Sequence, residues 1–198
     1  MGMSFFTNQV QASVKKHALV RYLRAGLDAE EMYSYGFAVG CSKSWLLTHY
    51  VADHLRLDGY DAVRMQDITE FDVEFDKAPF LRRCMEIKRQ MPSLPIGIQL
   101  DDTRSLLESI IDQYPVVVVH REQICPDECE IGTLKMVSDE AYALRWMTPT
   151  AEWADDEEVY RFEDVTRVTF GSEYETTIAV VAGLIKSKFR GASGFHMC

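Results

Sequence analysis

The sequence lacks most of the features by which a membrane protein, a secreted protein or a common type of enzyme is recognised. No apolar run approaches the roughly 20 residues that a membrane span needs, and the first lysines follow the first apolar residues, unlike a secretory signal. The 11 glycines form no phosphate-binding loop or dinucleotide fingerprint, and no serine or cysteine stands in a nucleophile elbow. We therefore expect a cytoplasmic protein that is not an enzyme and holds no cofactor.

Cysteine is too sparse and too irregular for a disulfide framework. The chain has five cysteines, an odd number, which indicates reduced thiols. Cys125 and Cys129 are spaced like zinc ligands, with His120 nearby, but a structural site needs four ligands and no second pair follows. His49 and His54 are five residues apart, which does not place two imidazoles on one helix face. We expect no metal site.

The negative charge is concentrated in one part of the chain. The sequence has 31 acidic and 21 basic side chains, a net charge of −10. Residues 126–175 hold 14 of the acidic and 4 of the basic ones, so 17 of each remain elsewhere. A nucleic-acid binder normally presents a positive surface to phosphates, and the second half of this chain does not.

One short phrase occurs twice. "MQDITEFDV" at residues 65–73 is followed by "FEDVTRVTF" at residues 162–170, and an offset of 96 or 97 also brings Gly36 onto Gly132. Aspartate accepts backbone N–H groups in turns and β-branched residues favour strands, so each phrase predicts the same bend into a strand. We interpret the offset as an internal duplication; the alternative is that two strand-rich segments share turn chemistry by chance.

Each copy is expected to contain a helix followed by about five short antiparallel strands. In the second copy Asp101-Asp102-Thr103 predicts a helix start, with an apolar face formed by Leu106, Leu107, Ile110 and Ile111. Between the copies Pro79 opens a helix whose predicted apolar face is Phe80, Leu81, Cys84 and Met85. Asp58-Gly59 predicts a hairpin turn.

The predicted fold class is mainly β with accessory helices (α+β), with two tandem five-stranded small barrels, Sm-like or SH3-like. A closed barrel removes exposed sheet edges. The expected divisions are a first barrel with its helix at residues 1–78, a connecting helix and linker at 79–100, a second barrel with its helix at 101–190, and a flexible tail at 191–198.

Four segments resemble the Sm-like (LSm-like) small β-barrel: "GFAVGCSKSWLLTHY" with "DAVRMQDITEF", and "IGTLKMVSDEAYALRWM" with "EVYRFEDVTRVTF". SH3-like barrels share this pattern, and the chain is also similar to bacterial proteins of this build that carry no assigned activity. The resemblance implies rings that bind single-stranded RNA, using an Arg-Gly or Lys-Gly near the fourth strand. That glycine is absent at Thr69-Glu70-Phe71 and Thr166-Arg167-Val168, which counts against RNA binding.

Aromatic and arginine side chains are the remaining candidates for contacts with a ligand or partner. Tyr60, Arg64 and Arg161 lie in or beside predicted strands, where they would stack on bases or anchor a protein; the alternative for the tyrosine is a place in the core. Trp153 stands in an acidic loop and is expected to face a partner, together with three neighbouring acids: Asp155, Asp156 and Glu157.

These observations favour a non-enzymatic adaptor or binding module, whose acidic second barrel associates with a basic protein partner or with another copy. The first alternative is RNA or nucleotide binding by the first barrel, through Lys15, Lys16, Arg21, Arg24 and Arg64. The second is a hydrolase or transferase with an unrecognised site.

Overall fold

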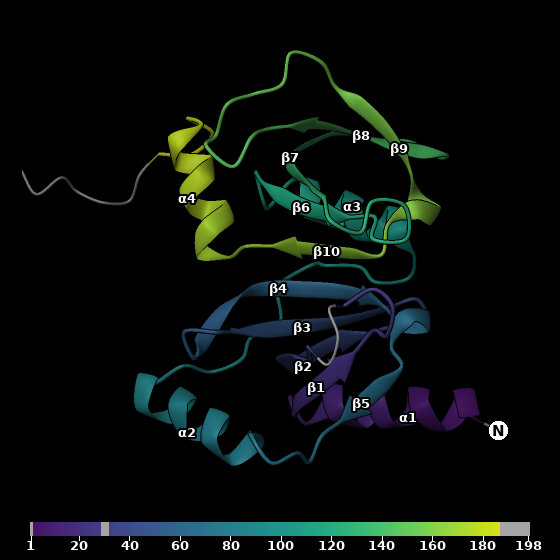
Figure 1. The fold of residues 1–198 in the computed structure, drawn as a ribbon, viewed down its shortest axis with the longest axis vertical. Helices are drawn as coiled ribbons and strands as arrows, with labels where there is room; N and C mark the ends of the chain where they lie inside the picture. Colours follow the sequence, from purple (N-terminus) through teal and green to yellow (C-terminus); the bar gives the residue numbers. More distant parts are fainter. Residues whose placement is uncertain (1, 29–31, 187–198) are drawn as a thin grey trace, which may run out of the picture.

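The computed structural model describes residues 2–28 and 32–186. The strands of this part are short and lie in two series (Figure 1). The first series is β1 (Leu19–Leu23), β2 (Ser34–Cys41), β3 (Trp45–Ala52), β4 (Arg56–Arg64) and β5 (Glu70–Asp72). The second is β6 (Val117–His120), β7 (Cys129–Val137), β8 (Ala141–Trp146), β9 (Glu158–Arg161) and β10 (Arg167–Phe170). The helices are α1 (Gly2–Lys15), α2 (Ala78–Lys88), α3 (Thr103–Ile111) and α4 (Glu173–Val181).

All ten strands of the described residues belong to one antiparallel sheet, with the order β5-β1-β2-β3-β4-β10-β6-β7-β8-β9. The α+β class is therefore confirmed. The expected closure into two barrels is not found, because the sheet is open and continuous across both series. The continuity arises where β4 pairs with β10, an antiparallel contact that uses the edge of each series and was not foreseen (Figure 1).

The two series repeat each other strand by strand. Each follows the same order, with its fifth strand beside its first: β5 next to β1 and β10 next to β6. The second and third strands of each series carry a register shift, at Ala38/Gly40 and at Leu134/Met136. A short 3-10 helix precedes the fifth strand in both, η1 (Met65–Asp67) and η2 (Phe162–Asp164). The predicted internal repetition is thus matched by strand order and by these irregularities.

The repeated phrase makes the same hydrogen bonds in both halves. The backbone N–H of Thr69 donates to Leu23 O at 2.9 Å, and that of Thr166 donates to His120 O at 2.8 Å. Each threonine hydroxyl also accepts the backbone N–H of the second residue after the first strand, from Ala25 at 3.0 Å and from Glu122 at 3.1 Å. In each half, the threonine of the repeated phrase therefore connects the segment after the 3-10 helix to the end of the first strand by hydrogen bonds.

The core is shared between the two series. Its largest cluster takes buried side chains from both, including Trp45 and Leu47 from β3 and Val168 and Phe170 from β10. The two helices between the series supply Leu81 and a further buried set to the same cluster: Met85, Leu106, Leu107 and Ile110. Burial of apolar surface therefore stabilises the two halves as one packed unit.

The helix predictions are largely confirmed. Asp102 caps α3, its carboxylate accepting the N–H of Ser105 at 2.8 Å, and Leu106, Leu107 and Ile110 are buried. The helix opened by Pro79 is α2, but Phe80 is 51% exposed, so its placement in the apolar face was wrong.

The hairpin turn predicted at Asp58-Gly59 was also wrong. The chain turns at residues 53–55, and Asp58 and Gly59 lie within β4, opposite a register shift in β3. Gly59 has a φ of +71°, and an added Cβ there would lie 2.8 Å from Phe170 O. Only glycine fits this position, because the backbone at the end of β10 approaches it closely. Rules that predict turns from neighbouring residues do not detect such a contact.

The predicted flexible tail at 191–198 lies outside the described residues, as does Cys198. None of the helices in the described segments is long and apolar enough to pass through a membrane.

Replacing Thr166 with valine tests the role of the repeated phrase. The Thr166 hydroxyl is fully buried, and its loss leaves the Glu122 N–H without a partner, so we expect the free energy of unfolding to fall by about 1–3 kcal/mol. Thr69→Val removes the equivalent bond at an exposed position and should cost less, since water replaces the lost acceptor. Chemical denaturation measures both, and equal losses would contradict this reading.

Candidate functional site

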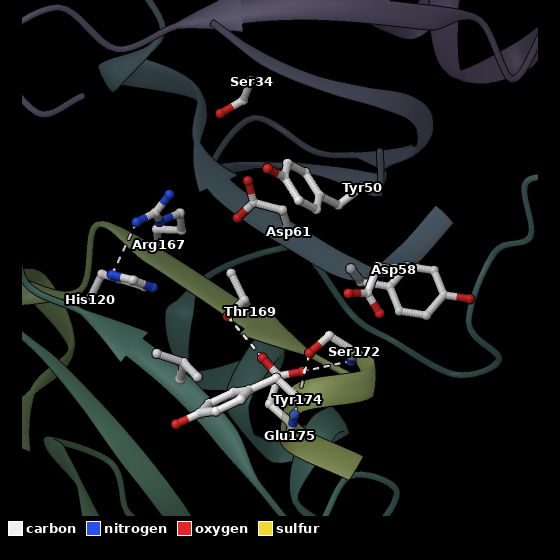
Figure 2. Close-up of a pocket in the computed structure, with 12 residues that line it drawn as sticks. Ser34, Tyr50, Asp58, Asp61, His120, Arg167, Thr169, Ser172, Tyr174 and Glu175 are labelled. Atoms are coloured by element: carbon white, nitrogen blue, oxygen red, sulfur yellow. Dashed lines mark hydrogen bonds between the residues drawn. The ribbon is translucent and has the colours of Figure 1, made fainter. Parts of the chain in front are cut away.

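A cavity of about 360 Å³ opens where the two series meet. β2, β3 and β4 supply one wall, and β6, β10 and the start of α4 supply the other (Figure 2). Carbon atoms form most of the exposed lining surface, although all the lining residues except Val118 carry a polar group: Ser34, Tyr50, Asp58, Tyr60, Asp61, Val118, His120, Arg167, Thr169, Ser172, Tyr174 and Glu175. A second hollow of about 420 Å³ shares Ser34, Tyr50, His120 and Arg167 with it, so the two hollows adjoin. The cavity exists because β4 pairs with β10.

Asp61 is the most deeply placed acid of the cavity. It lies on β4 directly opposite Thr169 of β10 and is only 3% exposed. One carboxylate oxygen, Oδ2, accepts the hydroxyl of Tyr22 at 2.5 Å, whereas Oδ1 has no hydrogen-bond partner among the described residues. Burial raises the pKa of Asp61, and the positive charge of Arg167 opposes that shift. An acid with one unsatisfied buried oxygen is costly unless something else pairs with it.

A buried network of charges crosses from the first series to the second. Arg24, after β1, donates to both carboxylate oxygens of Glu122, which follows β6, at 3.0 and 2.8 Å, and also pairs with Asp28 at 2.5 Å. Arg167 on β10 lies 3.1 Å from both Glu122 and the Nδ1 of His120. Two arginines thus hold one glutamate at the cavity margin, and Glu122 bridges the halves electrostatically.

This environment shifts the pKa values of its titratable groups. Burial and, to a smaller extent, the charge of Arg167 together lower the pKa of His120 to about 3, so the ring is neutral at physiological pH. For Glu122, burial raises the pKa, but the hydrogen bond from Arg24 and the charges of Arg167 and Arg24 outweigh burial and bring it to about 2. Glu122 is therefore ionised and His120 is an acceptor for Arg167.

The start of α4 closes the other end of the cavity. Ser172 and Glu175 form a capping box: Glu175 accepts the N–H of Ser172 at 2.6 Å, and the Ser172 hydroxyl accepts the N–H of Glu175 at 3.3 Å. Glu175 is 5% exposed and also lies 3.4 Å from the hydroxyl of Thr169 (Figure 2). Burial raises the pKa of Glu175. The carboxylate of Glu175 therefore accepts hydrogen bonds at the start of α4.

The residues selected from sequence are placed at three different locations. Tyr60 lines the cavity, stacked between the rings of His49 and Phe170. Arg64, at the end of β4, pairs with Asp67 at 2.6 Å and donates to Glu163 O at 3.1 Å, so it joins the two halves. Arg161 is largely exposed on β9 and pairs with Glu163.

Trp153 and the acidic residues belong to the loop that connects β8 to β9. Trp153 is half-buried: its ring packs on the small cluster around Met147 and Ile178, and the guanidinium of Arg145 lies 4.9 Å from the ring centroid. Asp155, Asp156 and Glu157 are exposed and lead into β9. β9 ends the strand order, so its outer backbone has no strand partner within the described residues. The structure thus combines an acidic loop with an open sheet edge.

The cysteine and histidine pairs weighed from sequence do not converge. In the described part of the chain, no three His, Cys, Asp or Glu side chains are grouped so as to hold a metal ion. Cys125 and Cys129 are free thiols at the start of β7, and burial raises the pKa of Cys129. His49 stacks on Tyr60, while His54 is exposed in the turn after β3.

Asp61, Glu122 and Arg167 were not selected from sequence as site residues. They come from β4, from the segment after β6 and from β10, positions separated by 45 to 106 residues, so no local spacing connects them. The only sequence signal was indirect: Arg167 lies within the second copy of the repeated phrase, at the position held by Glu70 in the first copy.

Comparison of the chain with protein-family models, with curated proteins and with solved structures found no match in any of the three.

The neutral His120 predicts a specific pH dependence of stability. Its folded pKa of about 3 lies below the ordinary 6.5, so between these values the unfolded chain binds one proton more. The free energy of unfolding should therefore fall as pH is lowered from 6.5, by up to about 1.4 kcal/mol per pH unit. The pKa of Glu122 is also lower in the folded protein than its ordinary value of 4.5, so the unfolded chain again binds more protons below pH 4.5 and the free energy of unfolding falls further there.

His120→Asn, which keeps an acceptor near the Nδ1 position, should flatten this dependence between pH 6 and 4.5, as measured by denaturant unfolding at several pH values. His54→Asn in the exposed turn is the matched control. An unchanged slope in the His120 variant would show that the ring is not held neutral.

Proposed function

We propose that the chain is a non-enzymatic protein-binding module of tandem Sm-like organisation, whose β9 edge and acidic loop receive a basic, extended segment of a partner protein. The observation that carries this proposal is the position of β9. It is the last strand of the sheet, and it is continuous with the most acidic surface loop of the chain.

The Sm-like interpretation is supported by the strand order. In each series the fifth strand pairs with the first and the remaining three follow in sequence, as β5-β1-β2-β3-β4 and β10-β6-β7-β8-β9. The contact between series, β4 with β10, joins a fourth strand to a fifth strand. An internal duplication accounts for both features, with the second copy occupying the place of a neighbouring subunit.

The β9 edge has the chemistry for addition of a strand. An unpaired edge offers backbone N–H and C=O groups, and side chains on alternate positions give specificity. Val159 is 65% exposed at this edge, with Glu158 before it and Asp155, Asp156 and Glu157 in the preceding loop. A partner strand that carries lysine or arginine beside an apolar residue complements this surface.

A second copy of the chain fits the edge less well. In the internal junction Asp61 lies opposite the uncharged Thr169. The residue equivalent to Asp61 in the second copy is Glu158 on β9, and the residue equivalent to Thr169 in the first copy is Asp72 on β5, each at an offset of 97. Both lie on the free edges of the sheet. Copying the internal register to a second molecule would set these two carboxylates opposite each other, and like charges directly opposite destabilise a strand pair. The proposal therefore favours a different, basic partner over self-association.

RNA binding by the first half is less well supported, because three of the five cations expected to carry it already have anionic partners, and of the five only Lys15 and Lys16 are exposed without an ion pair among the described residues. Arg24 is buried between Glu122 and Asp28, Arg21 pairs with Asp72 at 2.8 Å, and Arg64 pairs with Asp67. Counterion release needs cations that face phosphates rather than carboxylates of the same chain.

The proposed partner surface is tested with a fluorescent ten-residue peptide of alternating lysine and valine. We expect saturable binding that the triple variant Asp155→Asn, Asp156→Asn, Glu157→Gln weakens about tenfold, since each exposed ion pair contributes a few tenths of a kcal/mol or more. Fluorescence anisotropy at moderate salt measures the affinities. Val159→Lys should weaken binding as well, by removing the apolar contact and adding repulsion.

The matched control neutralises three exposed acids elsewhere, Glu74→Gln, Asp76→Asn and Asp112→Asn, which changes the net charge equally. If this control weakens binding as much as the loop variant does, the peptide senses only net charge and the proposed surface is wrong. A labelled single-stranded RNA that bound at low salt more tightly than the peptide would favour the alternative function.

The electrostatic argument against self-association gives a separate test. Wild-type protein should keep one mass across concentrations in light scattering, whereas Glu158→Lys, which would face Asp72 of a second copy, should associate with rising concentration and dissociate in high salt. Glu140→Lys, at the exposed β7–β8 turn, is the control for the added charge. Association of the wild type would contradict the like-charge argument.

A further inference from the structure

We propose that the cavity between the two halves binds a small organic polycation of the linear polyamine class, with an ammonium group held at Asp61. This site is separate from the β9 edge and does not depend on the partner proposed for that edge.

The first observation is the unsatisfied oxygen of Asp61. Residue Asp61 is 97% buried in a wall of the cavity, with Tyr22 occupying Oδ2 and no described group occupying Oδ1 (Figure 2). Arg167 does not donate to this oxygen: its Nη2 is directed to Glu122 and His120, and its Nε has no partner among the described residues. A donor supplied from the cavity would complete the hydrogen bonds of Asp61, and a positively charged donor would also stabilise its ionised form.

The second observation is the sign of the charge around the two hollows. Arg167 is the only lysine or arginine among the described lining residues, and it shares Glu122 with the buried Arg24. The carboxylates that line the hollows outnumber these two arginines. His120 is neutral. Carboxylates line both hollows: Asp28, Asp53, Asp58, Asp61, Glu122, Asp127, Glu128 and Glu175. A cation is therefore attracted to this space and an anion is repelled from it.

The third observation concerns the tyrosines of the lining. Tyr50 and Tyr174 line the first hollow, and Tyr50 also lines the second. The other tyrosines of the lining already contact side chains of the chain: Tyr60 stacks on His49 and Phe170, Tyr33 lies under Arg21 and Tyr35 under Lys77. Aromatic faces attract ammonium groups and pack against the methylene segments that connect them. A linear polyamine has both parts, and its successive ammonium groups would reach carboxylates in both hollows.

A bare metal ion fits the cavity less well than an organic cation. Within the described residues, no three acidic, histidine or cysteine side chains converge as a coordination shell would require. Divalent cations need several oxygen ligands at about 2.0–2.6 Å, whereas an alkylammonium group is satisfied by one carboxylate and an aromatic face.

Spermidine is the probe, titrated into the full chain by isothermal calorimetry at fixed ionic strength, with MgCl₂ as the charge control. We expect one saturable spermidine site that Mg²⁺ at the same ionic strength neither reproduces nor displaces. Asp61→Asn, which keeps an acceptor for Tyr22, should weaken binding about tenfold or more, because a hydrogen bond to a charged group is lost. Asp155→Asn in the distant acidic loop should change the affinity by less than about twofold.

Tyr174→Ala keeps the test decisive if Asp61→Asn fails to fold. Tyr174 is 45% exposed at the cavity margin, so its removal should leave the fold intact and weaken spermidine binding about two- to fivefold. The proposal is overturned if Mg²⁺ gives the same binding as spermidine, or if spermidine binds the folded Asp61 variant as tightly as wild type. An unchanged affinity in the Tyr174 variant would likewise overturn it when the Asp61 variant is unfolded.

Discussion

The antiparallel pairing of β4 with β10 is the constraint on which the rest of the structure depends. It joins the two strand series into one sheet, and it satisfies backbone groups that would otherwise form two more open edges. The apolar side chains of both series then merge into one core. The same pairing places the polar faces of β4 and β10 side by side, which creates the cavity containing Asp61 and Arg167. Architecture and candidate ligand site thus have a common origin.

A buried ionic cluster accompanies this junction and gives it specificity. Arg24, Glu122 and Arg167 are brought together from three strand ends, and desolvation of such a group costs several kcal/mol unless hydrogen bonds repay it. Here Glu122 accepts two hydrogen bonds from Arg24, and Thr166 lies within hydrogen-bond distance of its carboxylate. A shifted register of β10 would separate Arg167 from Glu122 and leave buried charges unpaired. The cluster therefore selects one arrangement of the two halves more than it stabilises either half alone.

The acidic side chains of the molecule lie in two separate groups. One group of carboxylates lies in the loop before β9, fully in solvent, where it would attract a basic partner over a distance set by salt. Another group lines the two hollows, where burial raises the pKa values of Asp61 and Glu175 and would strengthen the interaction of these carboxylates with a bound cation. Net charge alone suggests one acidic surface, but the fold divides the charge between an edge and a cavity.

The sequence by itself determined the features that depend on neighbouring residues. The cap of α3 at Asp102, the strand at Val117–His120 and the paired bends at Thr69 and Thr166 all follow from local propensity and hydrogen bonding. The tertiary structure alone decided that the sheet is continuous, that Gly59 meets the backbone after β10, and that Asp61, Glu122 and Arg167 converge. These features arise from contacts between residues about 45 to 110 positions apart, and the pattern of hydrophobic and polar residues along one strand does not specify which other strand will lie beside its edge.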